Sequence, residues 1–149
     1  MASGGSPKAF GRQVALAREE AARAGRDPDT FTFSMHVPTF TWSDGDPWEL
    51  IRAHHHYISW KYEDMADARS RPIGDPPPPP DLTPDQGEKL RKRIVMGTPE
   101  QVAEQVDAYL QAAGGNVHWI ARSYFPGLPW DIQLETMRLF AQEVLPQLR

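Results

Sequence analysis

Four side chains stand out in this 149-residue chain as candidates for chemistry or binding. His36 lies in an alternating polar and apolar segment, Arg122 lies in a second short apolar segment, and Lys92 and Arg93 end a basic run. Histidine can exchange protons near neutral pH, and lysine and arginine can bind anions. No nucleophile elbow, P-loop, HExxH or GxGxxG motif accompanies them. The residues therefore predict no reaction that the protein carries out by itself.

Three consecutive histidines, His54 to His56, raise the question of a metal site. Consecutive residues of a helix point about 100° apart, so they cannot converge on one ion as residues at i and i+4 can. We therefore predict no metal site, and we interpret the triplet as part of a solvated helix face.

Composition and charge limit the expected partners and cellular location of the protein. Sixteen basic and 20 acidic residues give a net charge of −4, which provides no electrostatic attraction for nucleic acid or an anionic membrane. The chain has no cysteine, and no apolar run reaches the roughly 18 residues of a membrane span. We expect a cytoplasmic protein without nucleic-acid or membrane partners.

The N-terminal quarter predicts a helix followed by a strand. Ser6 and Pro7 form an N-cap and first-position pair, and an apolar stripe at helical spacing ends before Gly25. The segment 31–37 then alternates apolar with polar residues, which is typical of a strand with two unlike faces. His36 belongs to the polar set and lies near the predicted C-terminal end of this strand.

The middle of the chain predicts a long helix over about 48–68, followed by a proline-rich stretch at 71–83. Because proline lacks an amide donor and fixes φ, we interpret 71–83 as an extended surface connector within one domain. A ligand for an SH3-like or WW-like domain is the alternative, although acidic rather than basic residues flank the run. Thr83 and Pro84 then begin a short helix.

The last third predicts a helix, a strand and a terminal helix. Thr98 and Gln101 form a capping box, and Gly114 ends the helix that follows it. The segment 116–123 has the β-branched and aromatic bias of a strand, and the loop FPGLP follows it. A helix over about 130–145 would bury an apolar stripe before Pro146 stops it. The stripe consists of Ile132, Met137, Phe140, Val144 and Leu145.

These pieces resemble the C-terminal portion of the luciferase-like monooxygenase family of flavin- or F420-dependent oxidoreductases. The resemblance rests on GTPEQVAEQV, a strand after GG, FPGLP and LFAQEVLP, in that order. Upstream, SGGSPKAF resembles the loop after the sixth strand of the family's barrel, and 31–37 resembles the seventh strand. The resemblance covers nearly the whole chain.

The resemblance implies an α/β fold, the C-terminal part of a (β/α)8 TIM barrel. We expect about two parallel strands, the seventh and eighth, with four to five helices, and one partial barrel domain over 1–149. A complete barrel takes about 250 residues, and the family carries most of its flavin-contacting residues in the strands before this portion. The barrel is therefore incomplete in this chain, and unpaired sheet edges would need another element or chain to cover them.

The resemblance also implies which residues face a substrate or cofactor. It places the loop with Gly4 and Gly5 at the top of the barrel, where free amides can accept an anionic or polar group. Gly5 stands where some relatives carry a lysine, which argues against a phosphate-sugar substrate. Lys92 or Arg93 matches a position at which some F420-dependent relatives hold an anionic substrate group. A solvated basic face is the alternative.

His36 and Arg122 complete the set of expected site residues. In a barrel both would point inward, and Arg122 near its strand end could reach substrate or a flavin phosphate. The alternatives are a hydrogen-bonded interior histidine and a salt bridge at the barrel rim.

The implied function is that of an oxidoreductase whose reduced cofactor, FMN or F420, carries the chemistry on a small organic substrate. No particular residue is predicted to be catalytic. The expected partners are the substrate and either a second copy of the chain or a chain that supplies the missing strands. A non-catalytic association module, completed by self-assembly or by a partner, is the alternative function.

Overall fold

A computed structural model describes residues 2–3, 5–67 and 79–148. Gly4 and most of the predicted connector at 71–83 lie outside the described residues. The part of the connector that is described, 79–83, belongs to no helix or strand.

The sheet is parallel throughout. Its two longer strands are β2 (Phe33–Thr41) and β4 (Val117–Arg122), which confirms both predicted strands. Two short strands were not expected: β1 (Ala2–Ser3) and β3 (Val95–Gly97) each pair with β2. The expectation of about two strands was therefore too low, because strands of two or three residues have no periodicity that a sequence could show.

Five α-helices connect and flank these strands, in agreement with the expected four to five. They are α1 (Pro7–Arg23), α2 (Pro47–Asp67), α3 (Pro84–Arg91), α4 (Pro99–Ala113) and α5 (Trp130–Leu139). A 3-10 turn at Pro28–Thr30 lies between α1 and β2. The expected caps are present, because Ser6, Thr83 and Thr98 each accept a hydrogen bond from the first turn of their helix.

The C-terminal helix differs from the single α-helix expected over 130–145. After α5 the chain forms a π-helical turn at Phe140–Val144 and then a 3-10 turn at Leu145–Gln147. Pro146 accounts for the change, since proline cannot donate the amide bond of a regular α-helix and crowds the carbonyl four residues earlier.

Strand β2 is longer than predicted, and Pro38 marks a change of partner within it. Residues 33–38 pair with β4, whereas Thr39–Thr41 pair with β3. In a sequence, proline indicates a strand end because it cannot donate a hydrogen bond to the ladder. In this structure Pro38 lies where the partner of β2 changes from β4 to β3. His36 is consequently the fourth of nine residues and not near the end of the strand.

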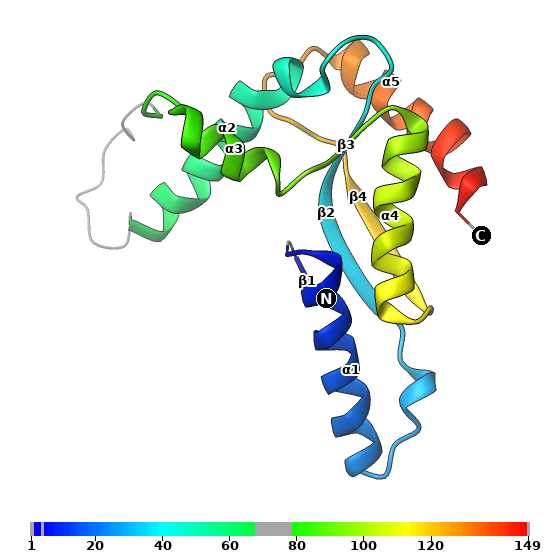
Figure 1. Cartoon of the computed structure of the whole chain (residues 1–149). Coiled ribbons are helices and arrows are strands. Elements are labelled where there is room, and N and C mark those ends of the chain that lie inside the picture. The colour runs from blue at the N-terminus through cyan, green and yellow to red at the C-terminus, as the bar shows by residue number, and fades with distance from the viewer. Residues whose placement is uncertain (1, 4, 68–78, 149) are drawn as a thin grey trace.

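The first hydrophobic cluster joins one face of the sheet to α1 and α4 (Figure 1). Met35 and Val37 of β2 are fully buried against it, as the alternating pattern predicted. Helices α1 and α4 approach closely at Gly11, where an added Cβ would lie 2.4 Å from the carbonyl oxygen of Ala112. On the opposite face of β2 and β4, His36, Ile120 and Arg122 belong to neither hydrophobic cluster of the described chain, whereas Phe40, further along the same face of β2, belongs to the second cluster.

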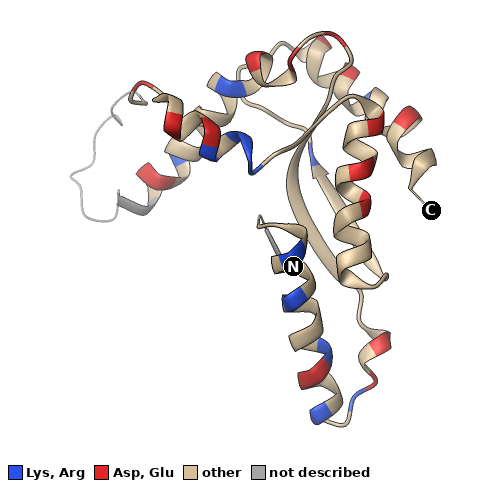
Figure 2. Ribbon diagram, in the orientation of Figure 1, with Lys and Arg blue, Asp and Glu red and all other residues tan. Residues whose placement is uncertain are grey.

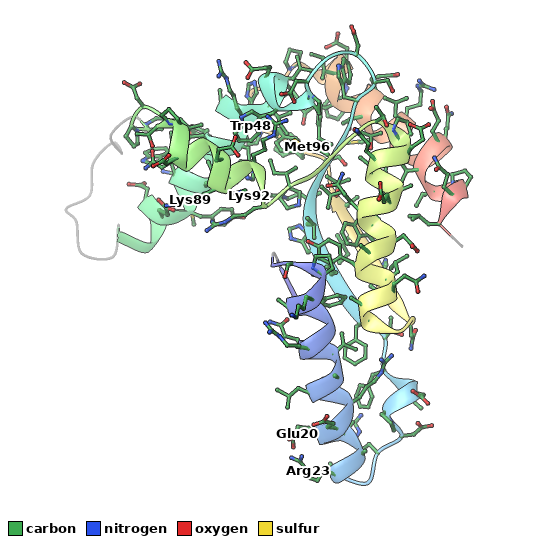
Figure 3. All side chains as sticks on the ribbon, viewed as in Figure 1. Glu20, Arg23, Trp48, Lys89, Lys92 and Met96 are labelled. Carbon is green, nitrogen blue, oxygen red and sulfur yellow. The ribbon has the colours of Figure 1, made fainter. Side chains whose placement is uncertain are left out.

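The second hydrophobic cluster lies at the C-terminal end of β2. Phe40 and Phe125 meet there edge to face at 5.7 Å, with Ile51 of α2 and Leu90 of α3 packed around them. In Figure 1 the helices α2 and α3 extend from this end of the sheet as an arm, and Figure 3 shows Trp48 and Met96 where the arm meets the sheet. The cluster therefore fixes the arm to the carboxyl ends of the strands.

Candidate substrate and cofactor site

The carboxyl ends of β2 and β4 define the region where a site is expected. Parallel strands end at the same edge of a sheet, and barrel enzymes assemble their sites there from the segments that follow the strands. In this structure those segments are the arm of α2 and α3, the stretch 92–94 before β3, and the loop 123–129 after β4. Three of the hollows that the described residues form among these segments and the sheet contain Gly5, Lys92, Arg93, His36 or Arg122.

The first hollow, called here the basic cleft, has a volume of about 720 Å³. It brings together Gly5, Lys92 and Arg93, three of the residues predicted to face a ligand. Gly5 has a positive φ of 94° and accepts a 2.7 Å hydrogen bond from the Tyr109 hydroxyl through its carbonyl oxygen. Lys92 follows α3 on the arm, as Figure 3 shows, and both it and Arg93 are exposed. Whether these three residues bind a ligand stays a prediction.

The second hollow, the sheet-face pocket, has a volume of about 440 Å³ and contains both His36 and Arg122. In the ladder of β2 and β4, His36 lies opposite Ile120 and Arg122 lies opposite Pro38. The predicted site residues thus form two groups, Gly5 with Lys92 and Arg93, and His36 with Arg122. Met137 of α5 and Phe140 of the π-helical turn after it close this pocket on one side.

Arg122 is the only charged residue in the four described strands, and Figure 2 shows the sheet almost entirely without charge. Its side chain is partly buried, and its Nε atom is buried without a hydrogen-bond partner among the described residues. Burial lowers the pKa of the guanidinium, and only the Tyr62 hydroxyl counteracts this effect. Within the described chain no carboxylate pairs with Arg122, so the rim salt bridge considered above is not seen there.

The third hollow, the tyrosine pocket, has a volume of about 420 Å³ and lies between α2 and the segment after β4. Its walls are mainly apolar, and Arg122 belongs to it as well as to the sheet-face pocket. The sequence analysis missed this pocket. Its signal was an aromatic and apolar stripe at helical spacing on the outer half of α2, of which only Ile58 packs against a hydrophobic cluster of the described chain. The lining residues are Tyr57, Ile58, Lys61, Tyr62, Met65, Arg122, Tyr124 and Pro126.

Two side chains hold the loop that forms one wall of the tyrosine pocket. The Gln133 amide accepts a 2.9 Å hydrogen bond from the backbone N–H of Phe125 and donates one of 2.9 Å to the carbonyl of Leu128. His54 Nδ1 lies 2.8 Å from the carbonyl oxygen of Pro126. Gln133 is 3% exposed although the sequence placed it outside the predicted apolar stripe. The loop is therefore positioned by polar contacts that sequence periodicity does not reveal.

His55 contradicts the interpretation of the histidine triplet as a solvated face. It is 4% exposed, meets Phe125 edge to face at 6.2 Å, and has no partner for Nδ1 in the described structure. Burial, together with the nearby charges of Arg122 and Arg93 and then of His56, lowers its pKa from 6.5 to about 4. His55 is therefore neutral at physiological pH. The described residues include no group of three or more potential ligands that could hold a metal ion.

Comparison with known proteins agrees with this architecture. A family model described as luciferase-like monooxygenase matches residues 1–116. The described fold is an open parallel sheet with flanking helices, which is consistent with part of a luciferase-like barrel. The chain belongs to the luciferase-like monooxygenase family.

Two solved structures are similar in fold to this chain. The monooxygenase RslO1 from Streptomyces bottropensis has 23% sequence identity and a TM-score of 0.63, and the match covers 97% of this chain and 40% of that one. The coenzyme F420 dependent tetrahydromethanopterin reductase from Methanopyrus kandleri has 19% identity and a TM-score of 0.54, with 99% and 44% covered. This chain therefore spans less than half the length of either relative. No match was found among curated proteins.

None of the described helices is both long enough and apolar enough to cross a membrane.

Proposed function

We propose that this chain forms the C-terminal part of a luciferase-like oxidoreductase that acts on a small organic substrate with reduced FMN or F420. The observation that carries the proposal is Arg122, a partly buried guanidinium without an acidic partner in the described chain, at the carboxyl end of β4. It borders two pockets, one of which also contains His36. Membership of the family supports the class of reaction.

The residues present fit an anionic cofactor. FMN and F420 both carry phosphate, and within the described residues Lys92, Arg93 and Arg122 form no ion pair that would neutralise them. Lys92 and Arg93 would hold an anionic group at the basic cleft, where the amides around Gly5 and the N-terminus of α1 add favourable dipoles. When bound, the cofactor supplies hydride transfer or oxygen activation. The chain itself would bind and orient the cofactor and substrate, and it would exclude water from them.

A second candidate function is favoured by the open sheet. Within the described residues β4 pairs only with β2, so its other edge presents unpaired backbone groups. The sheet face with His36 and Ile120 is likewise uncovered by either hydrophobic cluster. Both features fit an association module that is completed by a second copy or by a chain with further barrel strands.

Size-exclusion chromatography with light scattering, run with and without FMN or F420, distinguishes the two functions. Absorbance in the cofactor band is followed through the protein peak. A defined species that retains cofactor supports the oxidoreductase. A defined oligomer that never retains cofactor supports the association module and contradicts the enzyme function for this chain.

A further inference from the structure

We propose that the tyrosine pocket binds a small aromatic acid, with its ring between tyrosine side chains and its carboxylate on Arg122. The aromatic acid would be the substrate of the candidate site, and its role as a substrate rests on the proposed function. The binding itself can be measured without any turnover.

The walls of the pocket favour an aromatic ligand. Tyr57 and Tyr62 from α2 lie on one side and Tyr124 from the segment after β4 lies on the other. These residues remain 43%, 66% and 56% exposed, so each keeps ring surface that can stack on a guest, although the Tyr57 ring also contacts that of Trp60 at 5.5 Å. Volumes of a few hundred Å³ are typical of small-molecule sites, and this pocket has about 420 Å³.

The charges of the pocket favour an acidic group on that ligand. Of the two cations in its lining, Lys61 is already paired at 3.1 Å with the buried carboxylate of Asp64. Arg122 has neither an ion pair nor a hydrogen bond to a described residue, and no aspartate or glutamate lines the pocket. A partly desolvated guanidinium gains most from a carboxylate, which it can bind through two parallel hydrogen bonds.

The position of the loop wall is fixed before a ligand arrives. Tyr124 is followed directly by Phe125, whose N–H is held by Gln133, and Pro126 is held through its carbonyl by His54. A preformed wall lowers the ordering cost of binding. Arg122 also faces the sheet-face pocket with His36, so a ligand anchored there would lie next to the expected cofactor region at the strand ends.

The test compares two probes of equal shape, 2-naphthoate and 2-naphthamide, by isothermal titration calorimetry on the full chain. We expect 2-naphthoate to bind at least about tenfold more tightly, because a hydrogen-bonded charge pair contributes about that much or more. Arg122→Gln should remove the preference and leave the affinity for the amide unchanged, which also shows that the pocket remains folded. Arg52→Gln, which lies on α2 but outside the pocket, should change neither affinity.

A second variant, in the wall of the pocket, controls for an effect of the Arg122 substitution on folding. Tyr124→Ala removes an exposed ring and should weaken both probes while the ratio of their affinities stays the same. Equal affinity of the wild-type chain for the two probes, or a preference that survives Arg122→Gln, would overturn the proposal. Cofactor retention is read separately: a preference for naphthoate without retention of FMN or F420 leaves the pocket assignment intact and counts against the oxidoreductase.

Discussion

Gln133 holds both ends of the loop after β4 with one amide group. It accepts from Phe125 and donates to Leu128, and all three residues are buried. A second buried polar residue of α5, Thr136, accepts a 2.8 Å hydrogen bond from the backbone N–H of Thr41 at the end of β2. Helix α5 thus ties the carboxyl ends of both long strands together through hydrogen bonds.

The first prediction concerns Gln133→Leu. The substitution leaves a buried N–H and a buried carbonyl without partners, so we expect a loss of roughly 2–4 kcal/mol in the free energy of unfolding. Urea unfolding followed by circular dichroism measures it. Gln111→Leu, at an exposed position of α4, is the control and should change stability by less than about 0.5 kcal/mol. Equal effects of the two substitutions would contradict the role of Gln133.

The second prediction concerns His55. Because its folded-state pKa of about 4 lies below the ordinary value of 6.5, the unfolded chain binds the extra proton first as the pH falls. The contribution of neutral His55 is complete above pH 6.5 and is lost as the pH falls to 4. From about pH 7 to about pH 4, wild type should lose about 3 kcal/mol relative to His55→Leu.

Stability of both proteins measured across this pH range provides the test. His118→Gln, which changes an exposed histidine of β4, is the control for the loss of a histidine as such. Parallel stability curves for wild type and His55→Leu would show that His55 is not held neutral by burial.

At the scale of elements, two glycines within helices lie in opposite surroundings. An added Cβ at Gly11 of α1 would meet the carbonyl oxygen of Ala112 at 2.4 Å, whereas at Gly87 of α3 the nearest atom would be 3.8 Å away. Alanine favours a helix over glycine by about 1 kcal/mol where nothing obstructs it. Only the contact between α1 and α4 therefore requires glycine.

The third prediction uses these positions as a matched pair. Gly87→Ala should stabilise the protein by about 0.5–1 kcal/mol. Gly11→Ala should destabilise it, because the clash with backbone of α4 forces the two helices apart and outweighs the gain in helix propensity. Thermal unfolding of both variants measures the effects. A rise in melting temperature for both would show that α1 and α4 can separate at little cost.

Element boundaries were predictable where their causes are local. Ser6, Thr98 and Gly114 mark the helix ends in the sequence and in the structure, since caps depend on residues three or four positions apart. Strands β1 and β3 were not predictable, because they exist through pairing with β2, which is distant in sequence. The burial of Gln133, Thr136 and His55 was missed for the same reason.

The candidate site was predictable in part. The family resemblance selected Gly5, Lys92 and Arg93, and the structure brings these three to one cleft. It also selected His36 and Arg122, which share another. The tyrosine pocket required the structure, since Tyr57 and Tyr124 lie on elements 67 positions apart whose approach depends on the second hydrophobic cluster.

At the scale of the whole molecule, the open sheet leads to a fourth prediction. Ile120→Lys places a charge on the face of β4 that lines the sheet-face pocket and should weaken self-association while the chain stays folded, since Ile120 belongs to neither hydrophobic cluster of the described structure. Light scattering at several protein concentrations measures the mass. Leu16→Lys, at a 58% exposed position of α1, is the control. Identical masses for both variants and wild type would contradict association through this face.

Strand β2 runs through both hydrophobic clusters, with Met35 and Val37 in the first and Phe40 in the second. The arm of α2 and α3 packs chiefly on the second cluster, and it supplies only one wall of the tyrosine pocket, whereas Arg122 and Tyr124 belong to β4 and the segment after it. A chimaera that exchanges residues 42–94 for the corresponding segment of a relative should therefore need shape matching around the second cluster, with Phe40 and Phe125 at its centre. Such an exchange would replace the ring-binding wall from α2 and keep the sheet and the carboxylate-binding Arg122.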